Sequence, residues 1–67
     1  MIENLKNEIE FLLRIGGNNQ QIARIIASDW LRKMGADERE TAIEFIKNNF
    51  FDVFEAIRNS YPERMCS

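Results

Sequence analysis

Apolar residues recur along the chain at helical rather than strand spacing. Two glycine-containing interruptions, at residues 16–19 and 35–37, divide the chain into three such intervals. The first interval, residues 2–14, carries an apolar stripe about 100° wide, the width that one neighbouring helix covers. Its members are Ile2, Leu5, Ile9, Leu12 and Leu13. Phe11 lies near the opposite pole, among polar side chains.

The second interval, residues 18–34, predicts a longer helix with an apolar face about 180° wide. Gly16 and Gly17 are expected to end the first helix through a left-handed glycine, and Asn18 or Asn19 to cap the second. The apolar face consists of Ile22, Ala23, Ile26, Ala27, Trp30, Leu31 and Met34. Ile25 lies at its border, and Gly35 is expected to end the helix.

The third interval predicts one helix from Asp37 to about Asn59. Asp37 with Glu40 is typical of a capping box. The helix has an apolar face of about 180°, formed by Ala42, Ile43, Phe45, Ile46, Phe50, Val53, Phe54, Ala56 and Ile57. Phe51 falls outside that face. Pro62 cannot continue a regular helix, so residues 60–67 are expected to form an irregular tail.

These intervals predict an all-α fold of three helices joined by short turns, so that consecutive helices run antiparallel. Residues 1–59 would form a single helical domain. Such a short chain buries only about 60% of the surface that it exposes when unfolded. Its one cysteine, Cys66, cannot form an intrachain disulfide, and it has no histidine for a metal site. Oligomerisation or docking on a partner remains as the means of stabilisation.

The apolar faces are wider than the stripe that one neighbouring helix covers. Three explanations stay open: a monomer with a wide core and a few exposed apolar side chains, an interleaved homodimer, and a monomer that reserves the surplus for a different protein. We favour the homodimer, because it buries the surplus without an outside partner. The candidate interface residues are Phe11, Ile25, Trp30, Phe51 and Phe54. Trp30 and Phe54 also belong to the apolar faces of their own helices.

Composition excludes several function classes. The chain has nine basic and eleven acidic side chains, for a net charge of −2, which gives no overall attraction to nucleic acid or to anionic membrane. Without histidine, the commonest general base is missing, and no cofactor or metal motif is present. We therefore expect a non-enzymatic protein without cofactors. No apolar run reaches the length of a membrane span, and the mixed charges at the N-terminus differ from a signal peptide, so we expect a cytoplasmic location.

A nucleic-acid contact is the alternative function. The second interval is locally basic and aligns polar side chains of types that contact phosphates and base edges, namely Gln21, Arg24, Ser28, Arg32 and Lys33. A helix-turn-helix would need a break after about two turns. Here the apolar pattern continues unbroken to Met34, so that any bend would have to fall at Ala27 and Ser28. A solvated helix face explains the same stripe.

The run "FLLRIGGNNQQIARIIASDWLRK", together with the size and charge balance of the chain, resembles the small accessory proteins of lambdoid phages. Some of these are intertwined helical dimers that modulate other proteins and catalyse nothing. The resemblance implies a regulatory, protein-binding homodimer in the cytoplasm of a bacteriophage host. It assigns no functional residue.

Overall fold

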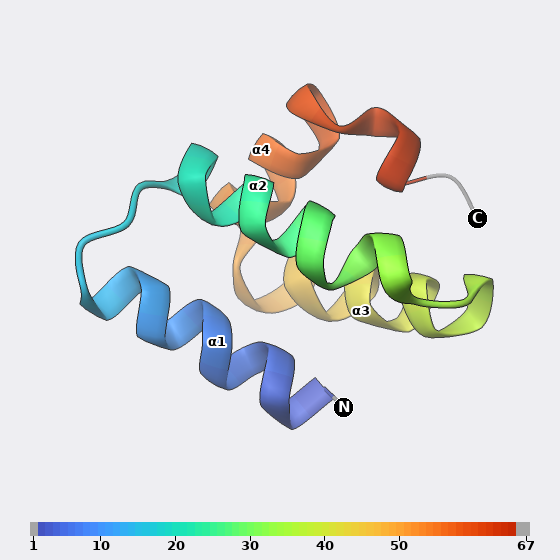
Figure 1. The fold of residues 1–67 in the computed structure, drawn as a ribbon, viewed down its shortest axis with the longest axis horizontal. Coiled ribbons are helices and arrows are strands. Elements are labelled where there is room, and N and C mark those ends of the chain that lie inside the picture. The colour runs from blue at the N-terminus through green and yellow to red at the C-terminus, as the bar shows by residue number, and fades with distance from the viewer. Residues whose placement is uncertain (1, 66–67) are drawn as a thin grey trace.

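The computed structural model describes residues 2–65 and shows an all-helical chain (Figure 1). The prediction of an all-α fold is confirmed, but the predicted number of three helices is wrong. Four α-helices are present, together with two short 3-10 helices. Their bounds are α1 (Ile2–Arg14), α2 (Asn19–Asp29), η1 (Leu31–Lys33), α3 (Ala36–Asn49), α4 (Phe51–Ser60) and η2 (Pro62–Arg64).

Helix α1 ends as predicted, through a glycine in the left-handed region. Gly16 has φ +91°, and its N–H donates to the Leu13 carbonyl oxygen at 3.2 Å. The N–H of Gly17 reaches back to the Leu12 carbonyl oxygen at 2.9 Å, which completes a Schellman motif. A Cβ at Gly17 would lie only 3.0 Å from that same oxygen and 3.5 Å from Cγ1 of Ile22. The turn from α1 to α2 therefore depends on both glycines.

Asn18 caps α2, which settles the choice between the two predicted asparagines. Its Oδ1 accepts a hydrogen bond from the Gln21 backbone N–H at 2.8 Å. In return, the Asn18 backbone N–H donates to Oε1 of Gln21 at 3.2 Å. This reciprocal pair is a capping box, and it satisfies two N–H groups that have no acceptor within the helix.

Helix α2 is shorter than the predicted helix over residues 18–34, which is a correction. It ends just before Trp30, and the chain then tightens into η1. In a 3-10 helix, residues three apart lie on the same side, so Leu31 and Met34 both remain buried after the break. Arg39 of α3 donates to the carbonyl oxygens of both residues, at 3.0 and 2.8 Å, and so satisfies the end of η1.

Helix α3 begins at Ala36, and Gly35 occupies the N-cap position before it without a side-chain cap. The predicted capping box of Asp37 and Glu40 is therefore wrong. Because the helix starts earlier than expected, Asp37 lies inside its first turn instead of preceding it. There its carboxylate is close to the positive end of the helix dipole.

The predicted continuous helix from Asp37 to Asn59 is broken at Phe50, the single residue between α3 and α4. Phe50 leaves the helical conformation, with φ −139° and ψ 62°. A straight helix over residues 36–60 would be about 37 Å long at 1.5 Å per residue, whereas the longest extent of the molecule is 30 Å. The bend lets residues on both sides of it, such as Ile46 and Ile57, share one core.

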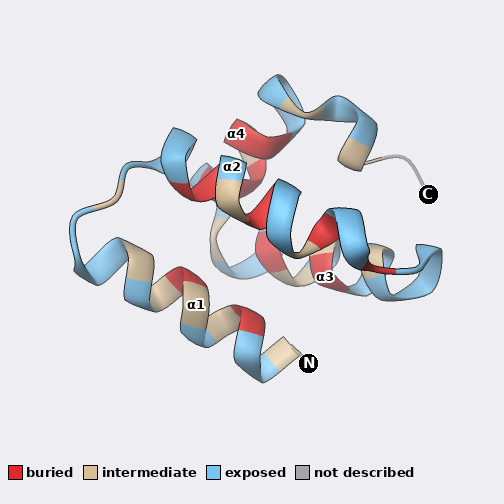
Figure 2. Cartoon of the chain, viewed as in Figure 1, coloured by how far each residue is buried: buried red, intermediate tan, exposed pale blue. Residues whose placement is uncertain are grey.

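The core lies where the four helices meet, as the buried segments in Figure 2 show. Helix α4 packs against α2 and α3, and α1 packs against the same two helices from another side (Figure 1). A hydrogen bond of 3.2 Å from Oγ of Ser60 to Oε1 of Gln20 joins the end of α4 to the start of α2. The most deeply buried large side chains are Leu5, Ile9, Ile22, Ile26, Leu31, Ile46, Val53 and Ile57.

The segment predicted as an irregular tail contains η2, with Pro62 at its first turn. Proline suits that position because the first N–H groups of a helix lack acceptors. Tyr61 and Met65, on either side of η2, pack against the core. Cys66 lies outside the described residues. No helix in the described part of the chain is long and apolar enough to cross a membrane.

Candidate protein interface

Among residues 2–65, the fold leaves four large apolar side chains exposed. Three of them lie at the end of α1 and one at the start of α4. Their exposed fractions are 50% for Phe11, 42% for Leu13, 62% for Ile15 and 52% for Phe51. Single exposed apolar residues are common in soluble proteins, whereas a group of them marks a candidate contact surface. We call these four residues, together with Ile25, the apolar end.

A surface hollow of about 250 Å³ joins the two helices of the apolar end. Leu13 of α1 and Phe51 of α4 both line it, so residues that are far apart in sequence share one site. Asn19, Asn49 and Asp52 add polar groups at the same hollow. Its lining is therefore apolar with a polar, negatively charged edge, which is a common composition for a protein contact.

A second hollow, of about 320 Å³, lies on the other flank of the α1 end. Ile15 and the partly buried Ile25 line it, and Arg24 supplies a positive charge there. Phe11 precedes Ile15 by four residues, and the Ile15 N–H donates to the Phe11 carbonyl oxygen at 3.1 Å. These two side chains therefore lie on neighbouring positions of the same helical face. The apolar end thus has two flanks with charges of opposite sign.

Phe51 is held in place by a buried ring beneath it. Its centroid lies 5.8 Å from that of Phe54, with an angle of 31° between the ring planes. Phe54 itself is only 9% exposed, with Lys47 and Arg58 placed near its ring. Arg58 also forms an ion pair with Glu55. Phe54 thus packs mostly inside the chain, where it supports the ring of Phe51, and the interface role predicted for it stays a prediction.

The other candidate interface residues divide between core and surface. Phe11 and Phe51 are exposed, as expected. Ile25 is half-buried, whereas Trp30 packs against the core at the C-terminal end of α2. The sequence pattern missed Leu13 and Ile15. Leu13 belongs to the predicted buried stripe but lies beyond the part of α1 that is buried at Leu5 and Ile9.

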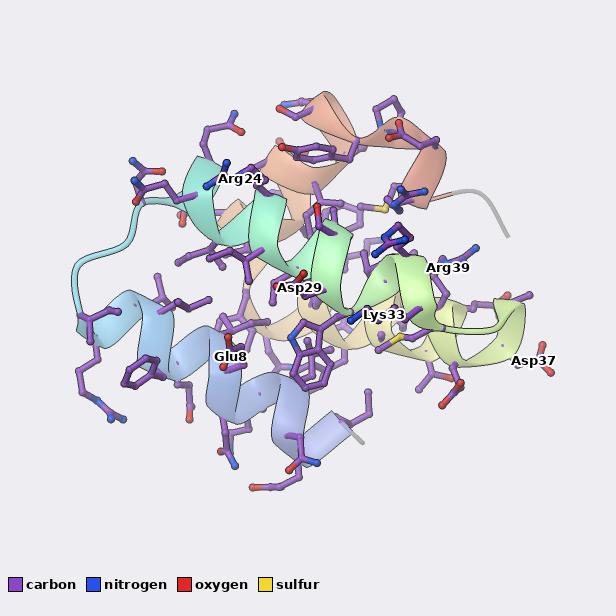
Figure 3. The ribbon with its side chains drawn as sticks, in the orientation of Figure 1. Glu8, Arg24, Asp29, Lys33, Asp37 and Arg39 are labelled. Carbon is purple, nitrogen blue, oxygen red and sulfur yellow. The ribbon has the colours of Figure 1, made fainter. Side chains whose placement is uncertain are left out.

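The candidate nucleic-acid residues all lie on the surface, but two of them already make local hydrogen bonds. Gln21 gives its side-chain oxygen to the capping box, and Nε of Arg32 donates to the Ser28 carbonyl oxygen at 3.2 Å. Arg24 and Lys33 are exposed, with the acidic Asp29 between them (Figure 3). The stripe is therefore less basic and less available than its sequence indicates.

The break after α2 does create a helix–turn–helix connection, at Trp30 and η1 and not at the expected Ala27 and Ser28. In DNA-binding proteins of this type, the N-terminal residues of the following helix contact the bases. Here that helix, α3, begins with the exposed acidic residues Asp37, Glu38 and Glu40. Asp37 points away from the rest of the molecule at the N-terminal start of α3 (Figure 3). Acidic side chains at this position repel DNA phosphates.

Among residues 2–65, no three carboxylate or thiol side chains come close enough together to hold a metal ion. Comparisons of the chain with protein-family models, with curated proteins and with solved structures find no match. The resemblance to phage accessory proteins therefore stays a prediction, and function has to be inferred from the geometry alone.

Proposed function

We propose that the chain is a non-enzymatic protein-binding module that pairs with a second copy of itself through the apolar end. The observation that carries this proposal is the shared hollow of Leu13 and Phe51, two exposed apolar side chains that α1 and α4 bring together. A protein of this size gains from association, since its single cysteine cannot form an intrachain disulfide and its core is small.

A second copy is the occupant that fits the charges of the two flanks. The hollow of Leu13 carries Asp52, and the hollow of Ile15 carries Arg24. In a two-fold dimer the same surface meets itself, so each contact between unlike flanks occurs twice. Such pairing would place Asp52 of one copy near Arg24 of the other. Burying the exposed half of one large apolar side chain contributes roughly 1 kcal/mol, so the four together are a substantial gain for a marginally stable domain.

A regulatory role follows from this assignment. The dimer would act by binding another macromolecule, in the way that the resemblance to phage accessory proteins implies. The absence of histidine from the sequence supports a binding role over catalysis. The DNA-binding alternative has weaker support, because α3 presents carboxylates where a recognition helix would meet phosphates.

Light scattering during size-exclusion chromatography tests the proposal. The wild-type chain should elute with twice its mass of 7.9 kDa. The double variant Leu13→Glu with Phe51→Glu should elute as a monomer with unchanged helical circular dichroism. Asn59→Glu, an exposed change on α4, is the matched control and should remain a dimer. A monomeric wild type across the micromolar range, or a double variant that stays dimeric, would overturn the proposal.

A further inference from the structure

The connection between α3 and α4 consists of Phe50 alone. No glycine or proline lies between residues 36 and 60, and the N-terminus of α4 has no side-chain cap. Backbone hydrogen bonds continue up to the break and resume directly after it, from the Phe50 N–H to the Ile46 oxygen and from the Phe54 N–H to the Phe50 oxygen. Local sequence does not demand a turn at this point. The bend is instead held by packing, which includes an edge-to-face contact between Phe50 and Phe45 with ring centroids 6.0 Å apart.

A straight α3–α4 helix would improve the local hydrogen bonding. The N–H groups of Phe51, Asp52 and Val53 form the first turn of α4, where a helix supplies no acceptors of its own. In a continuous helix they would donate to the carbonyl oxygens four residues earlier, in the last turn of α3. The apolar pattern also runs through this region without interruption, and for that reason the sequence predicts a single helix.

Straightening is unfavourable for a solitary chain. The straight helix would project beyond the 30 Å length of the molecule and would carry α4 away from α2 and α3. The apolar face of α4, made of Val53, Phe54, Ala56 and Ile57, would then be exposed to water. The surface of α2 that it covers would be exposed as well. Both surfaces can be buried again only by a partner that offers a surface like that of α2 to α4 and a helix like α4 to α2.

A second copy of the chain can bury both surfaces, because it carries the same α2 and the same α4. We infer that the homodimer forms by exchange of α4: in each chain α3 and α4 become one helix, and α4 occupies the site on its partner's α2 that it fills in the bent form. This inference rests on the proposed self-association and specifies how it occurs. All contacts of α4 are regained in the exchanged dimer, and only the hinge changes conformation, which is the usual basis of domain swapping.

The position of the apolar end agrees with this exchange. The hollow lined by Leu13 and Phe51 also includes Asn49, Phe50 and Val53, so it surrounds the hinge. In an exchanged dimer a second chain passes each hinge. The exposed side chains of Leu13 and Phe51 then lie at the point where the two chains meet.

Chemical cross-linking between Gln20 and Ser60 tests the exchange, because these side chains are in contact at 3.2 Å. In a Cys66→Ser background, Gln20→Cys and Ser60→Cys are combined, and the purified protein is treated with a short bismaleimide. Exchange predicts that most cross-linked product migrates as a covalent dimer on a denaturing gel. Each single-cysteine variant should give no covalent dimer, which controls for other contacts between copies.

The outcomes separate the two proposals. A dimer by light scattering whose cross-link lies within one chain would overturn the exchange and leave the homodimer intact. A monomer by light scattering would overturn the homodimer and the exchange together. A covalent dimer formed through Gln20→Cys and Ser60→Cys supports both.

A proline in the first turn of α4 provides a second test. Asp52→Pro removes an N–H that has no acceptor in the bent form, but it breaks a straight helix, because the ring clashes with the carbonyl four residues earlier. The variant should therefore be at least ten-fold weaker in dimerisation. The ten-fold loss is measured against the matched control Asp52→Ala, which removes the same carboxylate, and with it the proposed contact to Arg24, but permits a helix. An Asp52→Pro variant that forms as much covalent dimer as Asp52→Ala, each combined with Gln20→Cys and Ser60→Cys, would rule out the straight helix.

Discussion

Arg39 is hydrogen-bonded from Nε to the backbone oxygen of Leu31, eight residues earlier in the chain, at 3.0 Å. The same guanidinium group donates from a terminal nitrogen to the Met34 oxygen at 2.8 Å. One side chain of α3 thus satisfies two carbonyl groups of the turn that leads into it. The planar fork of donors in arginine suits this arrangement, whereas lysine offers a single charged nitrogen.

We therefore expect Arg39→Ala to lower the free energy of unfolding by about 1–3 kcal/mol, since it removes charge-assisted bonds to partly buried acceptors. Arg39→Lys should recover less than half of that loss. Urea denaturation followed by circular dichroism measures both effects. Arg24→Ala, a change of an exposed arginine on α2, serves as the control; at a protein concentration too low for dimerisation it should alter stability by less than about 0.5 kcal/mol. Equal effects of Arg39→Ala and Arg24→Ala would contradict a structural role for Arg39.

The two adjacent asparagines before α2 provide a matched pair. Asn18→Ala removes the side-chain acceptor of the capping box and should destabilise the protein by about 1 kcal/mol. Asn19→Ala changes an exposed residue inside the first turn, and we expect it to be neutral or slightly stabilising because of the higher helix propensity of alanine. Thermal unfolding of the two variants under the same conditions distinguishes them. A larger loss of stability for Asn19→Ala than for Asn18→Ala would contradict the assignment of Asn18 as the cap.

Phe51 and Phe54 should respond differently to truncation, although their rings are in contact. Phe54→Ala removes a buried ring and should cost about 3–5 kcal/mol of folding stability. Phe51→Ala removes a half-exposed ring and should cost less than about 1.5 kcal/mol within a single chain. Denaturation at low protein concentration measures the stability of the chain, and a concentration series measures dimerisation. A Phe51→Ala variant that loses as much stability as Phe54→Ala would show that Phe51 serves the core.

The polar stripe of α2 should not bind duplex DNA. Fluorescence anisotropy with a labelled duplex at about 50 mM salt offers the most favourable conditions, because the phosphate contribution is strongest at low salt. We expect no binding at micromolar protein. Removal of the acidic start of α3, by Asp37→Asn with Glu38→Gln and Glu40→Gln, should increase any residual binding. Measurable binding by the wild-type chain that Arg24→Ala with Arg32→Ala abolishes would restore the DNA-binding alternative.

The periodicity of apolar residues predicted the buried faces well. Leu5 and Ile9 of α1, and Ile22, Ala23 and Ile26 of α2, are buried as expected, because helical spacing determines which side chains share a face. The end of α1 at Gly16 was also predictable, since a glycine pair after an apolar stripe is a strong stop signal. These features depend only on residues close together in sequence.

The breaks at Trp30 and Phe50 could not be predicted in this way. Neither site has a glycine or proline, and both residues lie within continuous apolar patterns. The first break is stabilised by Arg39, whose bonds to the turn depend on the placement of α3. The second is held by the packing of α4 against α2 and α3, which a solitary chain would lose if the helix were straight. The exposure of Leu13 and Ile15 likewise depends on how far α1 is covered by its neighbours, which local spacing does not reveal.

Gly17 determines how closely the first two helices approach each other. In any other residue, the first side-chain carbon would press against a main-chain oxygen that already accepts a hydrogen bond, and main chain cannot rotate aside as a flexible side chain does. The close approach between the end of α1 and the start of α2 thus depends on the absence of a Cβ at this position. A related chain with a larger residue at this position would have to move the end of its first helix slightly away from this residue, and the hollow beside Arg24 would change shape with it.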